Sequence, residues 1–145
     1  MKKMLASCSV ILLILLLASS VAGCQPQAVQ HYNRGVELQE EGNYEQAILE
    51  YTNAIELDPN FADAYYNRGI AYKNKGEFDN AIADYSRAIE LDPNHTWAYY
   101  NRGNAYILKG EFDNAIADFN KVIEVSTNPD IIQAAREMVR ELEGH

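Results

Sequence analysis

The side chains best suited to catalysis or metal binding are scattered along this chain. Its three histidines are His31, His95 and His145, and none lies at metal-ligand spacing from another histidine or from a cysteine. The chain has no glycine-rich phosphate loop, and no serine or cysteine has a base at a spacing typical of nucleophilic catalysis. We therefore expect a protein that is not an enzyme and uses no metal or other cofactor.

The two cysteines both lie near the N-terminus. Lys2 and Lys3 precede a short apolar run, residues 10–18, and this order of charge and hydrophobicity is typical of a secretory signal. The following sequence Val21-Ala22-Gly23-Cys24 resembles the lipobox of bacterial lipoproteins, in which the cysteine is diacylated and becomes the new N-terminus. The resemblance implies a cleavable signal peptide over residues 1–23 and a lipid on Cys24. The alternatives are an uncleaved membrane anchor and a signal peptide without lipidation.

The resemblance also predicts where the protein is held. Residues 24–28 would form the lipidated cysteine and a short tether, which spans about 14 Å at full extension. Because Gln25 and not aspartate follows the cysteine, the lipobox rule implies the outer membrane, if the cell has one. We expect a domain outside the cytoplasmic membrane, close to the bilayer, whose partner also lies near the membrane.

The charge of the chain excludes some partners. Acidic residues outnumber basic ones by 21 to 12, giving a formal net charge of −9, and loss of the signal would remove two more lysines. Such a surface repels nucleic acid and anionic lipid headgroups. The acidity either keeps the protein soluble or favours basic partners.

The rest of the chain follows a 34-residue period. The sequence AYYNRG at 64–69 recurs at 98–103, and GEFDNAIAD at 76–84 recurs at 110–118. A period of this length is typical of a solenoid, in which one unit cannot bury its apolar face alone. Stacked units of this kind present an extended concave surface, which is suited to binding.

The sequence pattern of each unit predicts two amphipathic helices. In the second copy Tyr65, Gly69 and Tyr72 recur at helical spacing before a break at Gly76, and a second periodic segment follows. A glycine at that place ends a helix at low steric cost, and Asp-Pro ends the next one. The expected helices are residues 29–41, 44–57, 62–75, 78–91, 96–109 and 112–125. A final helix, 130–143, follows Asn128-Pro129, a cap followed by a first-turn proline.

These positions resemble the tetratricopeptide repeat (TPR) family. Its alternation of aromatic and small residues ending in proline is matched best by the second copy, and the first and third depart from it at His31, Leu38, Val122 and Thr127. The resemblance covers residues 28 to about 127. It implies an all-α, right-handed α-solenoid with repeats at 28–61, 62–95 and 96–129 and a capping helix. The matching residues of the second copy are Tyr65, Gly69, Tyr72, Ala81, Tyr85, Ala88 and Pro93.

The same resemblance implies a ligand-binding groove on the concave face, lined by the first helix of each repeat. Asparagine can donate to and accept from a peptide backbone, and tyrosine and tryptophan supply rigid contact area. The alternative is that these residues serve stacking between repeats, which Trp97 escapes best because tryptophan is not the family's usual residue there. The predicted groove residues are Tyr32, Asn33, Asp63, Tyr66, Asn67, Ile70, Trp97, Tyr100, Asn101 and Asn104, with Val29 and Val36 beside them.

Three further expectations concern contacts. An arginine in each repeat, Arg34, Arg68 or Arg102, is followed 16 residues later by an acid, Glu50, Asp84 or Asp118, and we expect each pair to form a salt bridge. Ile107 and Leu108 are expected to contact the capping helix. The clamp by which some family members hold acidic chaperone tails is not expected. Of the places it needs, Asn67 fits, whereas Tyr32, Val36, Trp97 and Asn101 differ.

Two functions remain open. The first is a non-catalytic interaction module whose groove binds a peptide segment or helix of a partner protein near the membrane. The second is a structural or assembly lipoprotein that acts by self-association in a cell-envelope complex, as a pilotin or an accessory of wall synthesis. Neither requires a nucleic acid, a small-molecule substrate or a cofactor.

Overall fold

The computed structural model describes residues 26–144, and this part of the chain is helical throughout. The predicted signal peptide and Cys24 lie outside the described residues, as does His145. Short turns join the helices, which differ from the expected bounds by at most two residues at either end. The helices are α2 (Gln27–Glu40), α3 (Tyr44–Leu57), α4 (Ala62–Asn74), α5 (Phe78–Leu91), α6 (Thr96–Lys109), α7 (Phe112–Val125) and α8 (Pro129–Glu143).

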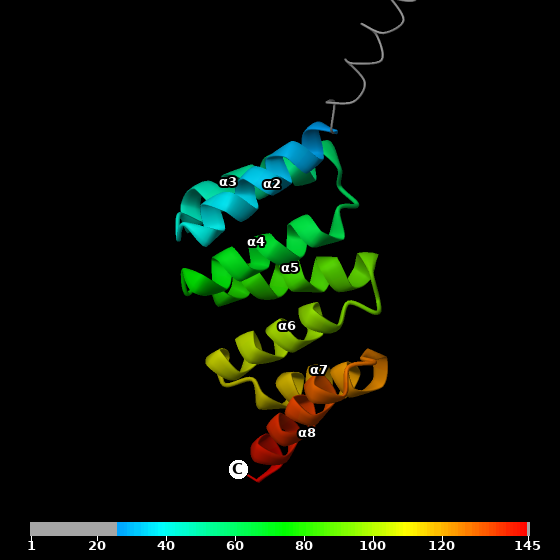
Figure 1. Cartoon of the computed structure of the whole chain (residues 1–145). Helices are drawn as coiled ribbons and strands as arrows, with labels where there is room; N and C mark the ends of the chain where they lie inside the picture. The colour runs from blue at the N-terminus through cyan, green and yellow to red at the C-terminus, as the bar shows by residue number, and fades with distance from the viewer. Residues whose placement is uncertain (1–25, 145) are drawn as a thin grey trace, which may run out of the picture.

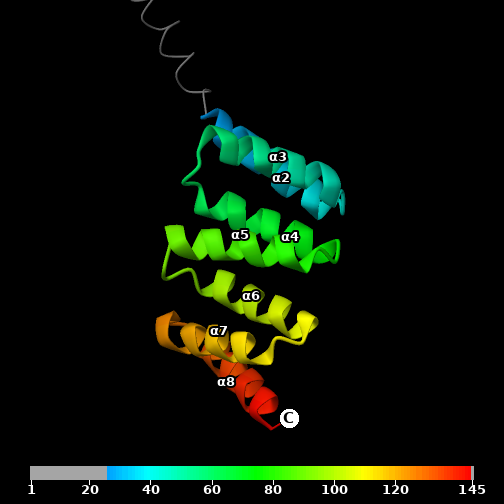
Figure 2. The ribbon, with the colours of Figure 1, turned by 180° about the vertical axis from the view of Figure 1, so that it is seen from behind.

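The helices form antiparallel pairs that stack in one direction (Figure 1). Each pair packs on the next, because the second helix of one pair contacts the first helix of the following pair. The reverse view shows the same order, with α8 beyond α7 at the end of the stack (Figure 2). The predicted all-α solenoid of three helix pairs and a capping helix is confirmed.

The turn after each first helix depends on one glycine. Gly76 has φ +79° and donates its N–H to the carbonyl oxygen of Lys73 at 2.9 Å. The next residue, Glu77, donates to the carbonyl oxygen of Tyr72, also at 2.9 Å. These two bonds form a Schellman motif, which needs a left-handed residue at this position and therefore favours glycine.

A second glycine lets the two helices of a pair approach closely. A Cβ atom added to Gly69 would lie 2.7 Å from Cε1 of Tyr85, a fully buried residue of the facing helix. Gly103 and Phe119 stand in the same relation in the third pair. The aromatic ring therefore packs directly on the helix backbone, as a ridge in a groove.

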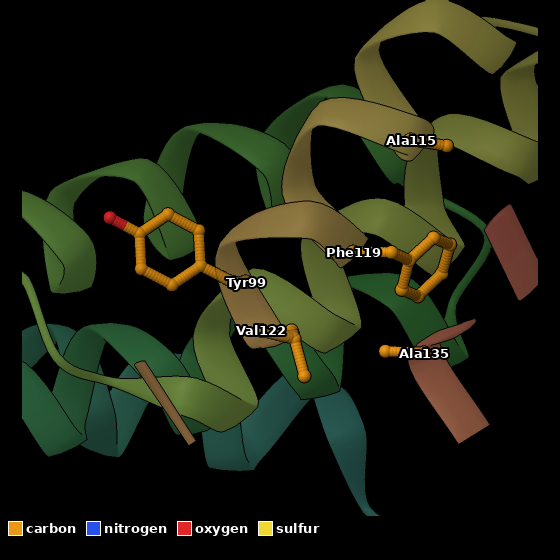
Figure 3. Close-up of a cluster of buried hydrophobic side chains, with 5 residues drawn as sticks. All are labelled: Tyr99, Ala115, Phe119, Val122 and Ala135. Carbon is orange, nitrogen blue, oxygen red and sulfur yellow. The ribbon is translucent and has the colours of Figure 1, made fainter. Parts of the chain in front are cut away.

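The last pair shares its core with the capping helix. Tyr99, Phe119 and Val122 are buried in one cluster with Ala135 of α8. Figure 3 shows the ring of Phe119 beside Ala135. Of the two residues expected to contact the capping helix, Ile107 packs on this cluster, whereas Leu108 is exposed.

In each of the two later helix pairs, a buried arginine forms an ion pair with the second helix of its own pair and a hydrogen bond with the pair before it. Nε and Nη2 of Arg68 donate to the two carboxylate oxygens of Asp84, at 2.7 and 2.8 Å. The side chains of Arg68 and Asp84 are only 16 % and 8 % exposed. The third nitrogen donates to the hydroxyl of Thr52, on α3 of the preceding pair, at 3.0 Å. Arg102 repeats this arrangement, binding the carboxylate of Asp118 and the hydroxyl of Ser86 on α5. The two salt bridges predicted for these arginines are confirmed.

The salt bridge predicted between Arg34 and Glu50 is wrong. Arg34 binds Glu37 of its own helix at 2.9 Å, and Glu50 is bound by Nδ1 of His31 at 2.6 Å. The physical reason lies in position: Arg34 is on the outermost described helix, where its side chain is 57 % exposed to water. Desolvation does not force a water-exposed guanidinium to bind a particular carboxylate.

We predict that Asp84→Asn destabilises the domain by about 3 kcal/mol or more, because it leaves a buried guanidinium without its counter-charge. Urea unfolding followed by circular dichroism measures this change. The matched control is Glu37→Gln, which removes the same charge from the exposed pair with Arg34 and should change the unfolding free energy by less than about 1 kcal/mol. Equal effects of the two substitutions would contradict the structural role given to Asp84.

Candidate functional site

The candidate site is the face formed by the first helices of the three pairs and by α8. α2 lies next to α4, and α4 next to α6. All ten predicted groove residues are on these three helices. Asn33, Asp63 and Trp97 are exposed, and a carboxylate oxygen of Asp63 lies 3.8 Å from Nε2 of His95. The other seven residues contact a neighbouring helix or line one of the two hollows described below, which Trp97 also lines.

Tyrosine and asparagine join successive first helices along this face. The amide nitrogen of Asn67 donates to the hydroxyl of Tyr32 at 2.8 Å, and that of Asn101 donates to the hydroxyl of Tyr66 at 2.9 Å. Burial raises the pKa of both tyrosines, so their hydroxyls are neutral at physiological pH. Four of the predicted groove residues, Tyr32, Tyr66, Asn67 and Asn101, therefore connect successive repeats.

Lys73 places a positive charge in the same face. Its ammonium group donates to the side-chain oxygen of Asn101 at 3.1 Å, so both ends of that amide are occupied. Burial lowers the pKa of Lys73, and among the described residues it forms no salt bridge. A half-buried ammonium with only a neutral partner keeps the capacity to bind an acceptor from outside.

Two hollows open on this face around α6. The larger, of about 540 Å³, lies towards the C-terminal end of α6 and is lined mainly by apolar side chains with Lys73 at its edge. The smaller, of about 190 Å³, lies at the N-terminal ends of α6 and α8. The first is lined by Lys73, Asn74, Phe78, Asn104, Ile107, Leu108 and Met138, and the second by Trp97, Tyr100, Asp130, Ile131 and Ala134.

Sequence reasoning missed two aromatic rings at the edge of the face. The Phe61 ring packs against Tyr32 with ring centroids 4.8 Å apart and an interplanar angle of 36°, and the His95 ring packs against Tyr66 at 4.7 Å and 41°. His95 also caps α6 by accepting the N–H of Ala98. Both residues lie just before a first helix and 34 residues apart, so comparison of the copies position by position could have found them.

The described residues contain neither a metal-binding cluster nor a membrane-spanning helix. Within residues 26–144, no group of three or more histidine, cysteine, aspartate or glutamate side chains is placed to hold a metal ion. Over the same residues, no helix has the length and hydrophobicity needed to cross a bilayer. The face offers contact area, amide groups and two charged side chains, Lys73 and Asp130, that form no salt bridge with another residue of the described part of the chain.

Comparison with protein families agrees with this architecture. The tetratricopeptide repeat family matches residues 62–95 and 96–128, and a second description of the TPR repeat matches residues 37–76. The chain belongs to the tetratricopeptide repeat family. A comparison with curated protein sequences found no match.

Solved TPR domains resemble the chain over most of its length. The second TPR domain of human RPAP3, determined in complex with an HSP70 peptide, is 30 % identical with a TM-score of 0.72, covering 81 % of this chain and 95 % of that domain. The second TPR of Spaghetti (RPAP3), bound to an HSP90 peptide, is 34 % identical with a TM-score of 0.67, covering 69 % and 93 %. The chaperone SycD of Yersinia enterocolitica, in complex with a peptide of the translocator YopD, shares the fold, with 18 % identity and a TM-score of 0.78 over 83 % and 95 %.

We predict that Tyr66 and Asn101 are coupled in stability. In a double-mutant cycle with Tyr66→Phe and Asn101→Ala, measured by urea unfolding, the coupling energy should be about 0.5–1.5 kcal/mol, the contribution of one hydrogen bond. Tyr100→Phe is the control. The residue 35 positions after Tyr66 is Asn101, whereas the residue 35 positions after Tyr100 is Ala135, whose side chain cannot form this hydrogen bond. That substitution should leave stability unchanged within about 0.5 kcal/mol. A coupling energy of zero would mean that the bond contributes nothing to stacking.

Proposed function

We propose that this TPR protein is a non-catalytic interaction module whose concave groove binds a peptide segment or a helix of a partner protein. One observation carries the proposal: the two hollows on the face of α4, α6 and α8 expose apolar surface between polar groups. Trp97 lines the smaller hollow and is 50 % exposed, although tryptophan is on average a largely buried residue. Apolar hollows with a few polar groups are the usual anchors for a bound side chain.

The related domains support this function. TPR domains of RPAP3 at 30 % and 34 % identity were determined with HSP70 and HSP90 peptides, so the fold at this level of similarity is used to hold peptides. The chain departs from the clamp for acidic chaperone tails at Tyr32, Val36, Trp97 and Asn101. Asn101 is also occupied by Tyr66 and Lys73. We therefore propose a partner segment other than such a tail.

The proposed position in the cell follows from the sequence alone. A lipid on Cys24 and a tether over residues 24–28 would hold the TPR solenoid against the membrane, outside the cytoplasmic membrane and on the outer membrane if the cell has one. The first described helix begins at Gln27, so few residues separate the proposed lipid from the folded domain. The partner would then meet the groove close to the bilayer.

Self-association in an envelope complex has less support. Stacking of solenoids end to end needs apolar end faces, and the outer face of the first pair carries polar contacts, His31 to Glu50 and Arg34 to Glu37. The opposite end is covered by α8, whose own outward side is rich in charge. Polar ends are what keeps a solenoid monomeric. Sedimentation velocity over a range of concentrations should give a monomer.

We predict that Trp97→Ala removes the proteins that can be crosslinked to the wild-type chain in membranes and recovered with it. Trp97 is the largest exposed contact in the groove, and loss of such an aromatic anchor costs about 2 kcal/mol or more of binding free energy. The measurement is crosslinking and pull-down from membranes, with recovered proteins compared by mass spectrometry. Recovery of an unchanged set would rule out the groove as the binding surface.

Leu49→Ala is the matched control for that experiment. Leu49 is 59 % exposed, but it lies on α3, a second helix away from the groove. Its truncation also removes exposed apolar surface, so it should leave the recovered proteins unchanged. Loss of partners in both variants would point to a general effect on the protein and not to the groove.

We predict that Cys24→Ala abolishes lipid labelling and membrane attachment. Each buried methylene contributes about 0.8 kcal/mol to membrane binding, and stable attachment needs two acyl chains, so loss of the acylated thiol should release the protein. Metabolic labelling with a fatty-acid analogue and fractionation of the cells test this. Cys8→Ala is the control, because Cys8 lies within the proposed signal peptide, and it should not alter labelling.

A further inference from the structure

Four of the five residues that line the smaller hollow, all except Tyr100, are ones that the 34-residue repeat does not contain. Trp97 takes the place that Val29 and Asp63 hold in the earlier copies, and Ala134 and Asp130 belong to the capping helix. We call this hollow, lined by Trp97, Tyr100, Asp130, Ile131 and Ala134, the Trp97 pocket. Its volume of about 190 Å³ holds a single side chain. The pocket therefore occurs at one place in the solenoid, at the junction of α6 and α8.

Two aromatic rings form one wall of the Trp97 pocket. The rings of Trp97 and Tyr100 lie edge to face, with centroids 5.9 Å apart and an interplanar angle of 76°. Tyr100 is held from behind by Phe119, at 5.5 Å and 73°. The wall is thus supported by the core of the last pair, and tryptophan is the aromatic side chain that attracts cations most strongly.

The hydroxyl of Tyr100 differs from those of the equivalent tyrosines, because no asparagine of the described residues donates a hydrogen bond to it. Tyr32 and Tyr66 each accept a bond from an asparagine 35 residues later, whereas position 135 is a buried alanine. Within residues 26–144 the Tyr100 hydroxyl has no hydrogen-bond partner. Tyr100 also lines the pocket, so its hydroxyl is available to a donor that reaches it.

Asp130 gives the pocket a negative charge. It lies in the first turn of α8 and is exposed, and no lysine, arginine or histidine of the described part of the chain forms a salt bridge with it. Its backbone N–H, and not its carboxylate, is engaged by the cap residue Asn128. The carboxylate is therefore available, on a protein whose net charge of −9 already attracts cations.

We propose that the Trp97 pocket binds an arginine side chain of the partner segment, an inference that rests on the proposed function of the groove. A guanidinium group is planar and weakly hydrated, so it stacks on the Trp97 ring while its donors reach the Asp130 carboxylate and the Tyr100 hydroxyl. A lysine ammonium is a compact and strongly hydrated charge, which fits a flat aromatic wall less well. An aliphatic side chain would pack on the apolar wall but would give the Asp130 carboxylate and the Tyr100 hydroxyl no hydrogen-bond donor.

Trp97 makes this pocket directly observable, because it is the single tryptophan of the chain. The full chain in detergent is titrated with N-acetyl-arginine methylamide, and the indole N–H resonance of Trp97 is followed by NMR. The comparison probes are the methylamides of N-acetyl-citrulline, N-acetyl-lysine and N-acetyl-leucine. Citrulline has nearly the same shape as arginine without the charge. The arginine probe should bind at least about fivefold more tightly than any of the others.

Two variants identify the charge responsible. Asp130→Asn should reduce the affinity for the arginine probe to that for citrulline. Asp113→Asn is the matched control, since Asp113 is also an exposed acid in the first turn of a helix, α7, but does not line the pocket. It removes the same net charge and should leave the preference for arginine intact.

Four outcomes overturn the proposal: equal binding of arginine and citrulline, equal binding of lysine, no response to any probe, or an equal loss in the two variants. These outcomes are independent of the groove experiment. If Trp97→Ala loses partner proteins while arginine shows no preference, the groove function stands and the arginine pocket is wrong. If arginine binds selectively while the recovered proteins do not change, the pocket exists and the groove function is wrong.

Discussion

The buried guanidinium groups of Arg68 and Arg102 are the constraint on which the stacking of this solenoid depends. Each binds an aspartate on the second helix of its own repeat and a hydroxyl on the second helix of the repeat before. A buried guanidinium left without its counter-charge is strongly destabilising, so the three helices must meet in one register. The apolar contacts alone, largely alanine against aromatic ring, would tolerate small slips more easily.

This constraint acts between repeats and so weakens at the ends of the array. Arg34 occupies the same place in its repeat as Arg68 but lies on the outermost described helix, where water solvates it and Glu37 suffices as a partner. His31 then binds Glu50. At the other end the capping helix supplies Ala135, and the core closes with an apolar contact to Phe119 (Figure 3). The ends are therefore different in chemistry although the sequence period is the same.

Much of the fold could be predicted because its signals are local and repeated. Glycine at φ +79° and the Asp-Pro pairs mark helix ends directly, and Arg68 and Asp84 recur at fixed spacing in the next copy. The groove residues were harder to predict, because a residue on a first helix can face either the ligand side or the next repeat. The sequence alone does not show which of these two contacts forms. Asn101 is bonded to Tyr66 and Lys73, and His95 packs against Tyr66 although the sequence places it in a loop.

The charges left over by these contacts give the groove a direction. Lys73 lies by the hollow at the C-terminal end of α6, and Asp130 lies by the hollow at its N-terminal end. Trp97 and Ile107 are ten residues apart on one helix, so the two hollows are separated by about 15 Å. The repeats contribute the identical scaffold, and the polarity of the groove comes from the positions at which the copies differ.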